Sequence, residues 1–210
     1  MIDSQDITAL VLAGGRGSRM GGVDKGLQPF LGTPLALHAA RRIAPQVAGV
    51  MFNANRHLHS YAAWDLPVWP DAQADFAGPL AGFAAGLAHC PTPWLLTLPC
   101  DTPLFPPDLA TRLAAAAAQA GAPLAMAAAP DEAGEPRIHA VFCLLRTTLL
   151  PDLERFIAAG GRRVQEWTRQ HGPAVATFNR PDDDARAFAN ANTLEELRAL
   201  EMLARGQHGG

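Results

Sequence analysis

The stretch ITALVLAGGRGSRMGGVDKG, residues Ile7 to Gly26, decides the fold that we expect for this chain. Its first part, Ile7–Ala13, is a short apolar run with little alternation, which predicts a strand covered on both faces. A glycine-rich segment follows this strand directly. Because ligands bind at the carboxyl ends of the strands in open α/β sheets, the segment after Ala13 is a candidate ligand-binding loop.

Short apolar runs and helical patterns alternate along the rest of the chain. Further strands are predicted at Gly49–Asn53, Val68–Trp69, Trp94–Leu98, Leu124–Ala128 and Ile138–Leu144. Helices are predicted at Thr33–Ala44, Pro79–His89, Pro107–Ala120, Thr147–Ala159 and Leu194–Ala204, the last with a capping box of Thr193 and Glu196. This alternation is typical of a parallel sheet. We therefore expect an α/β fold, a single Rossmann-like domain (1–210) with a mostly parallel sheet flanked by helices.

The composition excludes several classes of protein. Of the 210 residues 49% are hydrophobic and 18% charged, which indicates a globular chain. The net charge of −3 disfavours a nucleic-acid partner. Three cysteines without a CxxC pair indicate a reducing compartment. The sequence has no apolar run of about 18 residues and no leader pattern, so we expect a cytoplasmic protein with no membrane partner.

The loop from Gly14 to Gly26 combines glycines with three cations. Glycines let a backbone approach a ligand closely and point its N–H groups at an anion. Arg16, Arg19 and Lys25 add positive charge, so the loop predicts a site for several phosphates. The alternative is a surface loop with solvated arginines.

Two common phosphate loops do not match this segment. A Walker A loop needs a hydroxyl residue after its lysine, but Lys25 is followed by Gly26. The dinucleotide fingerprint needs a glycine at the position of Met20. The loop therefore indicates another class of nucleotide site.

A carboxylate, Asp101, follows the predicted strand Trp94–Leu98 and lies between Pro99 and Pro103. A nucleoside triphosphate arrives with Mg²⁺, which prefers one or two carboxylates together with phosphate oxygens and water. Asp101 is expected at the same sheet edge as the glycine-rich loop. From the residues alone it is either a metal ligand or an Asx-turn residue.

The segment Leu12–Gly26 resembles the signature loop of the molybdenum cofactor guanylyltransferases, a branch of the nucleotide-diphospho-sugar transferase superfamily. The double glycine Gly14-Gly15 and the run Gly21–Gly26 are typical of that branch. Six further segments match the family's pattern in the same order: Asn53–Arg56, Asp71, Gly78–Gly82, Pro99–Pro103, Gly161–Val164 and Asn190–Thr193. The resemblance therefore covers most of the chain.

The resemblance implies an enzyme that transfers GMP from GTP to the terminal phosphate of molybdopterin (molybdenum cofactor). The products would be the guanine dinucleotide cofactor and pyrophosphate. Mg²⁺ is the implied cofactor. GTP, molybdopterin, other cofactor-biosynthesis proteins and molybdoenzyme chaperones are the implied partners. About 1–109 would form the nucleotide-binding half of the domain, and about 110–205 the acceptor-binding half.

The resemblance also implies the site residues. The catalytic set is Arg19, Lys25, Asp101 and Asn192, with Asp101 as the metal ligand. The nucleotide is expected to contact Leu12, Ala13, Gly14, Gly15, Lys25, Asn53, Asp71 and Asp101. From the residues alone, Asn53 and Asp71 either read the guanine edge or satisfy turn backbone. Asn192 either lies near the reacting phosphate or caps the last helix.

Three alternative functions remain. A cytidylyltransferase for the same cofactor and a sugar-phosphate nucleotidyltransferase share the chemistry, and the residues alone leave the choice between GTP and CTP open. A non-catalytic nucleotide-binding regulator belongs to another class. A regulator needs no metal carboxylate facing a cationic loop, so Asp101 argues against it.

Overall fold

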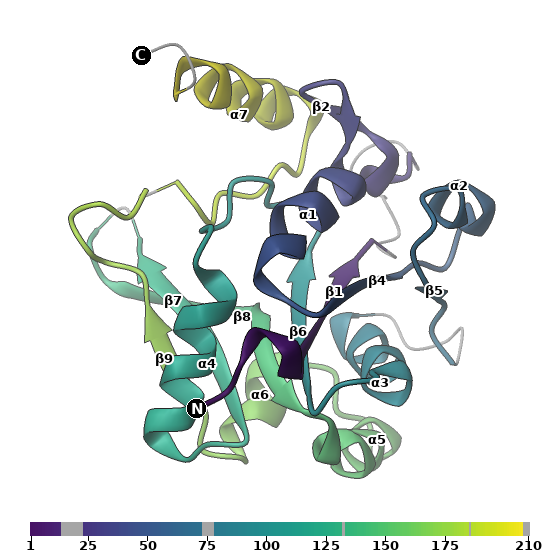
Figure 1. Cartoon of the computed structure of the whole chain (residues 1–210), viewed down its shortest axis with the longest axis vertical. Coiled ribbons are helices and arrows are strands. Elements are labelled where there is room, and N and C mark those ends of the chain that lie inside the picture. Colours follow the sequence, from purple (N-terminus) through teal and green to yellow (C-terminus); the bar gives the residue numbers. More distant parts are fainter. Residues whose placement is uncertain (14–22, 73–77, 132, 185, 208–210) are drawn as a thin grey trace.

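The computed structural model of the chain describes residues 1–13, 23–72, 78–131, 133–184 and 186–207. Within these residues seven strands form one sheet, in the order β5-β4-β1-β6-β8-β7-β9 (Figure 1). The strands are β1 (Ile7–Leu12), β4 (Gly49–Asn53), β5 (Val68–Trp69), β6 (Trp94–Pro99), β7 (Leu124–Pro130), β8 (Pro136–Arg146) and β9 (Ala174–Thr177). A separate hairpin pairs β2 (Pro29–Phe30) with β3 (Thr33–Pro34).

One strand of the main sheet runs against the others. β8 is antiparallel to both of its neighbours, β6 and β7, whereas all other neighbouring strands are parallel. The chain between β7 and β8 is too short for a crossover, so β8 turns back beside β7. The prediction of a mostly parallel sheet is confirmed.

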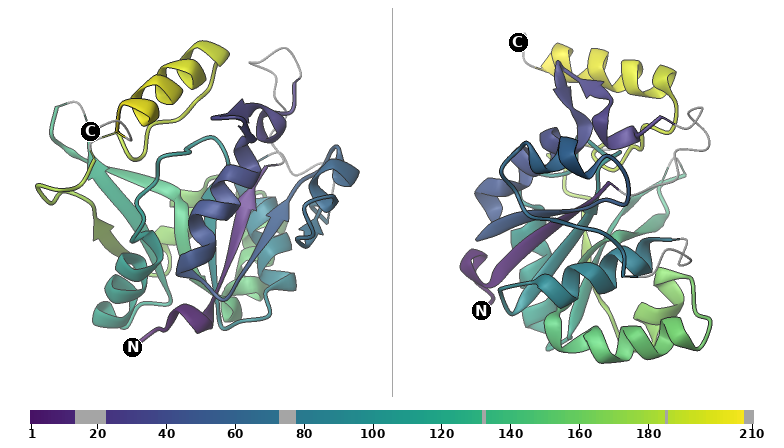
Figure 2. Two further views of the ribbon diagram at one scale, coloured as in Figure 1. Left: turned by 45° about the horizontal axis from the view of Figure 1, so that its top comes forward. Right: turned by 90° about the vertical axis from the view of Figure 1, so that its right-hand side faces the viewer.

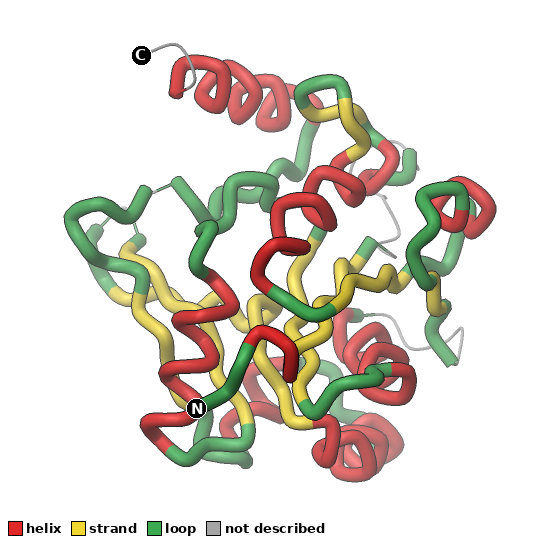
Figure 3. Tube along the Cα trace, viewed as in Figure 1, coloured by secondary structure: helices red, strands yellow, loops and turns green. Residues whose placement is uncertain are grey.

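Helices cover both faces of this sheet (Figure 2). They are α1 (Leu35–Ile43), α2 (Leu58–Ala62), α3 (Pro79–His89), α4 (Leu109–Ala120), α5 (Leu150–Ala158), α6 (Val164–Arg169) and α7 (Leu194–Gln207). The 3₁₀ helices are η1 (Ser4–Asp6), η3 (Lys25–Leu27), η4 (Ala44–Gln46) and η5 (Thr147–Leu149). The strands gather at the centre, with the helices around them (Figure 3).

The core has a layer on each face of the sheet. Ala9 and Val11 of β1 pack in the layer that includes α1 and α4. Leu10 of β1 packs in the other layer, with α3, α5 and α6. Both layers are apolar, which is why β1 reads as a continuous apolar run rather than an alternating one.

Helix α7 lies apart from the sheet, against the β2–β3 hairpin (Figure 1). Leu197 and Leu200 of α7 are buried with Phe30 of β2 and Leu35 of α1. A small third core therefore fixes the C-terminal helix next to the N-terminal part of the chain. None of the helices in the described ranges is long and apolar enough to cross a membrane.

Several helix boundaries differ from the prediction. The helix expected at Thr33–Ala44 begins at Leu35, because β3 pairs with β2 instead of joining the helix. The helix expected from Pro107 begins at Leu109. The helix expected at Thr147–Ala159 opens with the 3₁₀ turn η5. The sequence patterns did not predict α2, α6, β9 or the β2–β3 hairpin.

Candidate functional site

The carboxyl ends of neighbouring strands meet at one edge of the sheet. Leu12 of β1 lies opposite Asn53 of β4 on one side and opposite Pro99 of β6 on the other. The chain leaves these strands at the same edge, and Asp101 follows β6 by two residues. Asp71 likewise follows β5, the neighbour of β4. The register of the sheet thus brings Leu12, Asn53, Asp71 and Asp101 to the same edge.

Lys25, Asp101 and Asn192 form a group at this edge, which we call the cation cluster. The Lys25 ammonium nitrogen, Nζ, donates to Asp101 Oδ2 at 2.7 Å and to Asn192 Oδ1 at 3.2 Å. The side chains of Lys25 and Asp101 are 19% and 21% exposed, so a ligand can reach them. The three residues come from η3, from the loop after β6 and from the segment before α7.

The segment before α7 docks on the Asp101 loop through its backbone and side chains. The Ala191 N–H donates to the Asp101 carbonyl oxygen at 2.8 Å. The buried Thr102 hydroxyl donates to Asn190 Oδ1 at 2.7 Å. These bonds join two segments about ninety residues apart and hold Asn192 beside Asp101. Thr102 and Asn190 were not among the predicted site residues.

Asn192 is not the capping residue of α7. The Thr193 hydroxyl accepts from the Glu196 N–H at 3.1 Å, and the Glu196 carboxylate accepts from the Thr193 N–H at 3.0 Å. The predicted capping box is therefore confirmed, and it belongs to Thr193. The same carboxylate accepts from the Asn192 N–H at 2.6 Å. The Asn192 side chain has no capping task and lies against Lys25.

Two asparagines hold the Asp71 carboxylate. Its Oδ1 accepts from Asn53 Nδ2 at 2.8 Å, and its Oδ2 accepts from Asn55 Nδ2 at 2.8 Å. The Asp71 N–H donates back to Asn55 Oδ1 at 2.8 Å. Asn53 Nδ2 also donates to the Trp69 carbonyl oxygen at 3.0 Å, so both hydrogens of this amide bond within the protein. Asp71 is fixed in one orientation, and its oxygens retain lone pairs for a ligand.

Asn55 is a residue of this site that was not predicted, although it lies within a matching segment. The signal was its spacing of two from Asn53, since alternate residues of an extended chain point to the same side. Only the structure shows that both amides meet Asp71.

Gly82 lets α3 pack directly on the site. A Cβ at this position would lie 2.5 Å from Asn53 Oδ1 and 2.6 Å from Leu12 Cδ2. Real Cβ atoms essentially never approach so closely, so a side chain at this position would displace Asn53 or Leu12. The matching segment Gly78–Gly82 therefore has a packing role at the ends of β1 and β4.

Cys100, next to Asp101, is a buried thiol. Burial raises the pKa of Cys100 well above its usual value, and the nearby Asp101 charge adds to this effect. A neutral buried thiol is a poor nucleophile. Cys100 therefore has a packing role, and Cys90 and Cys143 are free cysteines as well.

The remaining predicted residues belong to the start of the glycine-rich loop. Leu12 ends β1, and the Ala13 N–H donates to the Asn53 carbonyl oxygen at 2.9 Å. Both residues therefore lie at the sheet edge beside the Asn53–Asp71 pair. The predicted residues Gly14, Gly15 and Arg19 lie outside the described residues.

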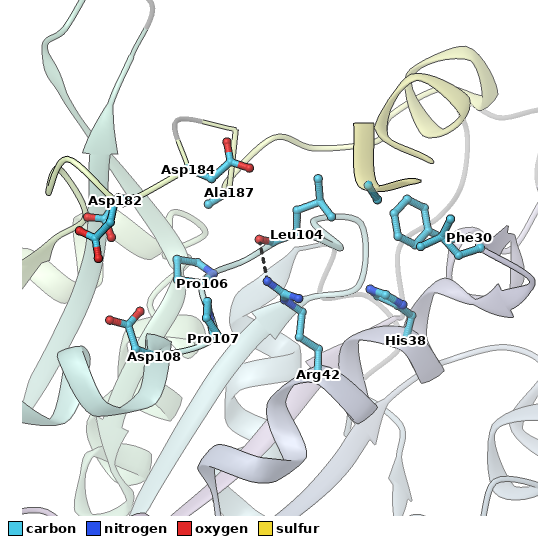
Figure 4. Close-up of a pocket in the computed structure, with 13 residues that line it drawn as sticks. Phe30, His38, Arg42, Leu104, Pro106, Pro107, Asp108, Asp182, Asp184 and Ala187 are labelled. Atoms are coloured by element: carbon cyan, nitrogen blue, oxygen red, sulfur yellow. Dashed lines mark hydrogen bonds between the residues drawn. The ribbon is translucent and has the colours of Figure 1, made fainter. Parts of the chain in front are cut away.

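A pocket of about 380 Å³ lies beside α1 (Figure 4). His38 and Arg42 of α1 line it together with the aspartates at 182–184. Arg42 Nε donates to the Phe105 carbonyl oxygen at 2.6 Å and its Nη2 to the Leu104 carbonyl oxygen at 3.3 Å. None of the predicted site residues that the structure describes lines this pocket.

The cation cluster has donor atoms that suit Mg²⁺. Asp101 Oδ2 and Asn192 Oδ1 converge on one positive charge, the Lys25 ammonium. These are hard oxygen donors, which Mg²⁺ prefers. The described residues contain no group of three or more His, Cys, Asp or Glu placed to hold a metal. A cation at Asp101 would therefore take most of its ligands from phosphates and water, as Mg²⁺ usually does.

This fold and this site are those of a nucleotidyltransferase. A mostly parallel α/β sheet presents a lysine and a carboxylate at its carboxyl edge, and in the sequence a glycine-rich segment precedes this lysine. Comparison with protein families agrees, because the family described as MobA-like NTP transferase domain matches residues 9–175.

Relatives with curated descriptions narrow the class further. A molybdenum cofactor guanylyltransferase from Acidovorax ebreus is 63% identical over 97% of this chain and 99% of its own length. Another, from Methylibium petroleiphilum, is 58% identical over 96% of this chain and 98% of its own length. The chain therefore belongs to the molybdenum cofactor guanylyltransferases, within the MobA-like NTP transferases.

A solved structure shares the fold. The molybdopterin-guanine dinucleotide biosynthesis protein A from Archaeoglobus fulgidus superposes with a TM-score of 0.73, over 95% of this chain and 99% of that chain. The two sequences are 19% identical. The likeness confirms the α/β nucleotidyltransferase fold.

Proposed function

We propose that the protein transfers GMP from GTP to the terminal phosphate of molybdopterin, forming the guanine dinucleotide cofactor and releasing pyrophosphate. The cation cluster carries this proposal, because Lys25, Asp101 and Asn192 converge on the sheet edge from three separate parts of the chain. Membership of the guanylyltransferase family supports the choice of GTP and molybdopterin.

Asp71 is the residue that would read the base. Guanine presents N1–H and an amino group on one edge, and a carboxylate accepts from both. Asn53 and Asn55 hold Asp71 in one orientation, so its oxygens are fixed before the nucleotide binds. Leu12 and Ala13, at the end of β1, would contact the nucleotide through their backbone.

The reaction needs no general base from the protein. The second pKa of a phosphate monoester is about 6, so at pH 7 its oxygen is already largely ionised. This oxygen attacks the α-phosphorus of GTP. The bond from that phosphorus to the bridging oxygen breaks, and pyrophosphate leaves with the electron pair. Lys25 and Arg19 would neutralise the charge that grows on pyrophosphate, so catalysis consists of positioning and charge stabilisation.

Asp101 would hold Mg²⁺, with the Asn192 oxygen beside it. Bound Mg²⁺ would supply positive charge shared with the phosphate oxygens. In the structure described here the Lys25 ammonium neutralises Asp101. With Asp101 engaged as a metal ligand, the Lys25 ammonium would be available to contact the triphosphate.

The same proposal assigns about 1–109 to the nucleotide and about 110–205 to the acceptor. The position of Asn192 supports it, since this residue reaches Lys25 of the first half from the second half of the chain. We place the reaction in the cytoplasm, as the three free cysteines suggest. Other cofactor-biosynthesis proteins and molybdoenzyme chaperones would deliver and receive the cofactor.

The test compares nucleotides and acceptors in one assay. Purified protein receives Mg²⁺, either GTP or CTP at equal concentration, and either molybdopterin or a sugar phosphate as acceptor, and pyrophosphate release and product mass are measured. We expect the guanine dinucleotide, with one pyrophosphate per product. Faster turnover with CTP would assign the cytidylyltransferase activity. Turnover only with a sugar phosphate as acceptor would assign the sugar-nucleotide activity, and nucleotide binding without turnover would indicate a regulator.

A further inference from the structure

Tyr61, the only tyrosine of the chain, lies in the short helix α2 with its side chain fully buried. Its ring packs against Phe52 and Trp64, at centroid distances of 5.7 and 5.2 Å. A phenylalanine ring would fill the same space, so packing does not account for the hydroxyl. The hydroxyl donates to Asp24 Oδ1 at 2.8 Å, outside α2.

The Asp24 carboxylate connects this hydroxyl to the turn that carries Lys25. Asp24 Oδ1 also accepts from the Gly26 N–H at 3.1 Å. Gly26 packs beside the hydroxyl, since a Cβ there would overlap Tyr61 Oη and would lie 3.2 Å from Ala13 Cβ. The backbone is thus held on both sides of Lys25, by a hydrogen bond and by close packing.

Burial of the Asp24 carboxylate is unfavourable for stability. It is 6% exposed, and a carboxylate removed from water loses solvation that hydrogen bonds only partly replace. The best-attested use of a buried charged group is to fix one arrangement among several. The arrangement fixed here is η3, from which the Lys25 side chain reaches Asp101 at 2.7 Å.

We propose that Tyr61 is a positioning residue for catalysis, which acts through Asp24 to hold Lys25 at the reacting phosphates. The inference rests on the proposed function, because that function gives Lys25 its task at the triphosphate. Tyr61 contributes no group to the substrate. Its hydroxyl determines where the ammonium lies when charge grows on the leaving pyrophosphate.

The test is a double-mutant cycle on the full-length protein with Tyr61→Phe and Lys25→Ala. Pyrophosphate release gives kcat, and calorimetry gives the Kd of GTP. Tyr61→Phe should lower kcat about tenfold, because small displacements of a positioned group have large effects on rate. The Kd of GTP should change less than about threefold, since other contacts still hold the nucleotide. In the Lys25→Ala background the same change should leave kcat unaltered, because the group that it positions is gone.

Thr97→Val is the matched control, because it also removes a fully buried hydroxyl. Thr97 Oγ1 donates to the Val141 carbonyl oxygen of β8 at 2.7 Å, so its loss should lower Tm but not kcat. A Tyr61→Phe variant with the wild-type kcat would overturn the proposal. If Tyr61→Phe lowered kcat by the same factor in the wild-type and Lys25→Ala backgrounds, Tyr61 would have only a structural role and the proposal would be overturned. An equal loss of kcat in Thr97→Val would overturn it as well. A Lys25→Ala variant with the wild-type rate would instead overturn the proposed function of the site.

Discussion

The ion pair between Lys25 and Asp101 is well placed for exchange with a ligand. Both side chains are about one fifth exposed, and partly exposed ion pairs contribute little net stability. Each partner can therefore leave the other at small cost when a metal or a phosphate offers a better contact. The ion pair keeps both charges at the site, and it is weak enough for Lys25 to exchange to a phosphate and for Asp101 to exchange to a metal.

Asp101→Asn keeps the size of the side chain and removes its charge. Mg²⁺ gains little from a neutral amide, so the variant should hold the metal poorly. We expect a fall in turnover on the order of 10²–10³ at saturating GTP, with a much smaller change in GTP affinity. The measurement is pyrophosphate release across a Mg²⁺ titration. Asp108→Asn, at a carboxylate that is 44% exposed at the other end of the same β6–α4 connection, is the control. A near-normal rate for Asp101→Asn at low Mg²⁺ would mean that Asp101 is a turn residue.

Asn55→Ala should affect guanine selectivity. It removes one of the two amides that fix Asp71, and one such hydrogen bond contributes about 0.5–1.5 kcal/mol. We therefore expect the Kd of GTP to rise about three- to tenfold, with little change for CTP. Equal changes for GTP and CTP, measured by calorimetry, would show that Asp71 does not read the base.

The sequence predicted the single residues of the site better than their connections. Lys25, Asp101 and Asn192 were expected from their chemistry and from the family resemblance, and the structure brings them together. Asn55 and Tyr61 were missed for a physical reason. Each acts through a hydrogen bond to a residue on another segment, and the partner on that segment is known only from the structure.

At the scale of the elements, those that the sequence patterns missed are all short. The strand β1 and the helices α3 and α4 are long enough for their burial pattern to be read from the sequence. The elements α2, α6 and β9 span five, six and four residues. They are stabilised by tertiary contacts, such as the complete burial of Trp167 in α6, and not by a periodic face.

Helix α7 links its own capping to the site. The Glu196 carboxylate accepts the N–H groups of both Asn192 and Thr193. Glu196→Ala should lower Tm by a few degrees, as the loss of a helix cap usually does. It should also slow pyrophosphate release, because the backbone of Asn192 is no longer held.

The chain offers a matched control for this prediction. The carboxylate of Asp6 closes a second capping box, by accepting the N–H of Asp3 at 3.1 Å. Asp6→Ala should lower Tm in a similar way and leave turnover at the wild-type value. If both variants had the same turnover, the position of Asn192 would not depend on its cap.

For the whole molecule, two half-buried histidines predict a loss of stability in acid. Burial lowers the pKa of His139 to about 4, and the charge of Arg137 adds to this shift. Burial also lowers the pKa of His38. An unfolded histidine has a pKa near 6.5, so below that pH the unfolded chain binds protons that the folded chain does not. The free energy of unfolding should keep its full value above about pH 6.5 and should fall as the pH drops toward 4.

His139→Phe tests this prediction, since its ring can stay stacked on Phe188. Denaturant unfolding at several pH values should show a shallower fall between about pH 6.5 and 4 for this variant than for the wild type. Parallel profiles for His139→Phe and the wild type would show that His139 does not titrate differently on folding.

Guanylyl transfer is tested most directly by following the phosphorus atoms of GTP. The protein receives Mg²⁺, molybdopterin and GTP labelled either at the α-phosphorus or at the γ-phosphorus. We predict that the α label appears in the pterin product, that the γ label appears in pyrophosphate, and that the two products form in equal amounts. Transfer of the γ label to the pterin, or its release as inorganic phosphate without a dinucleotide product, would contradict nucleotidyl transfer at this site.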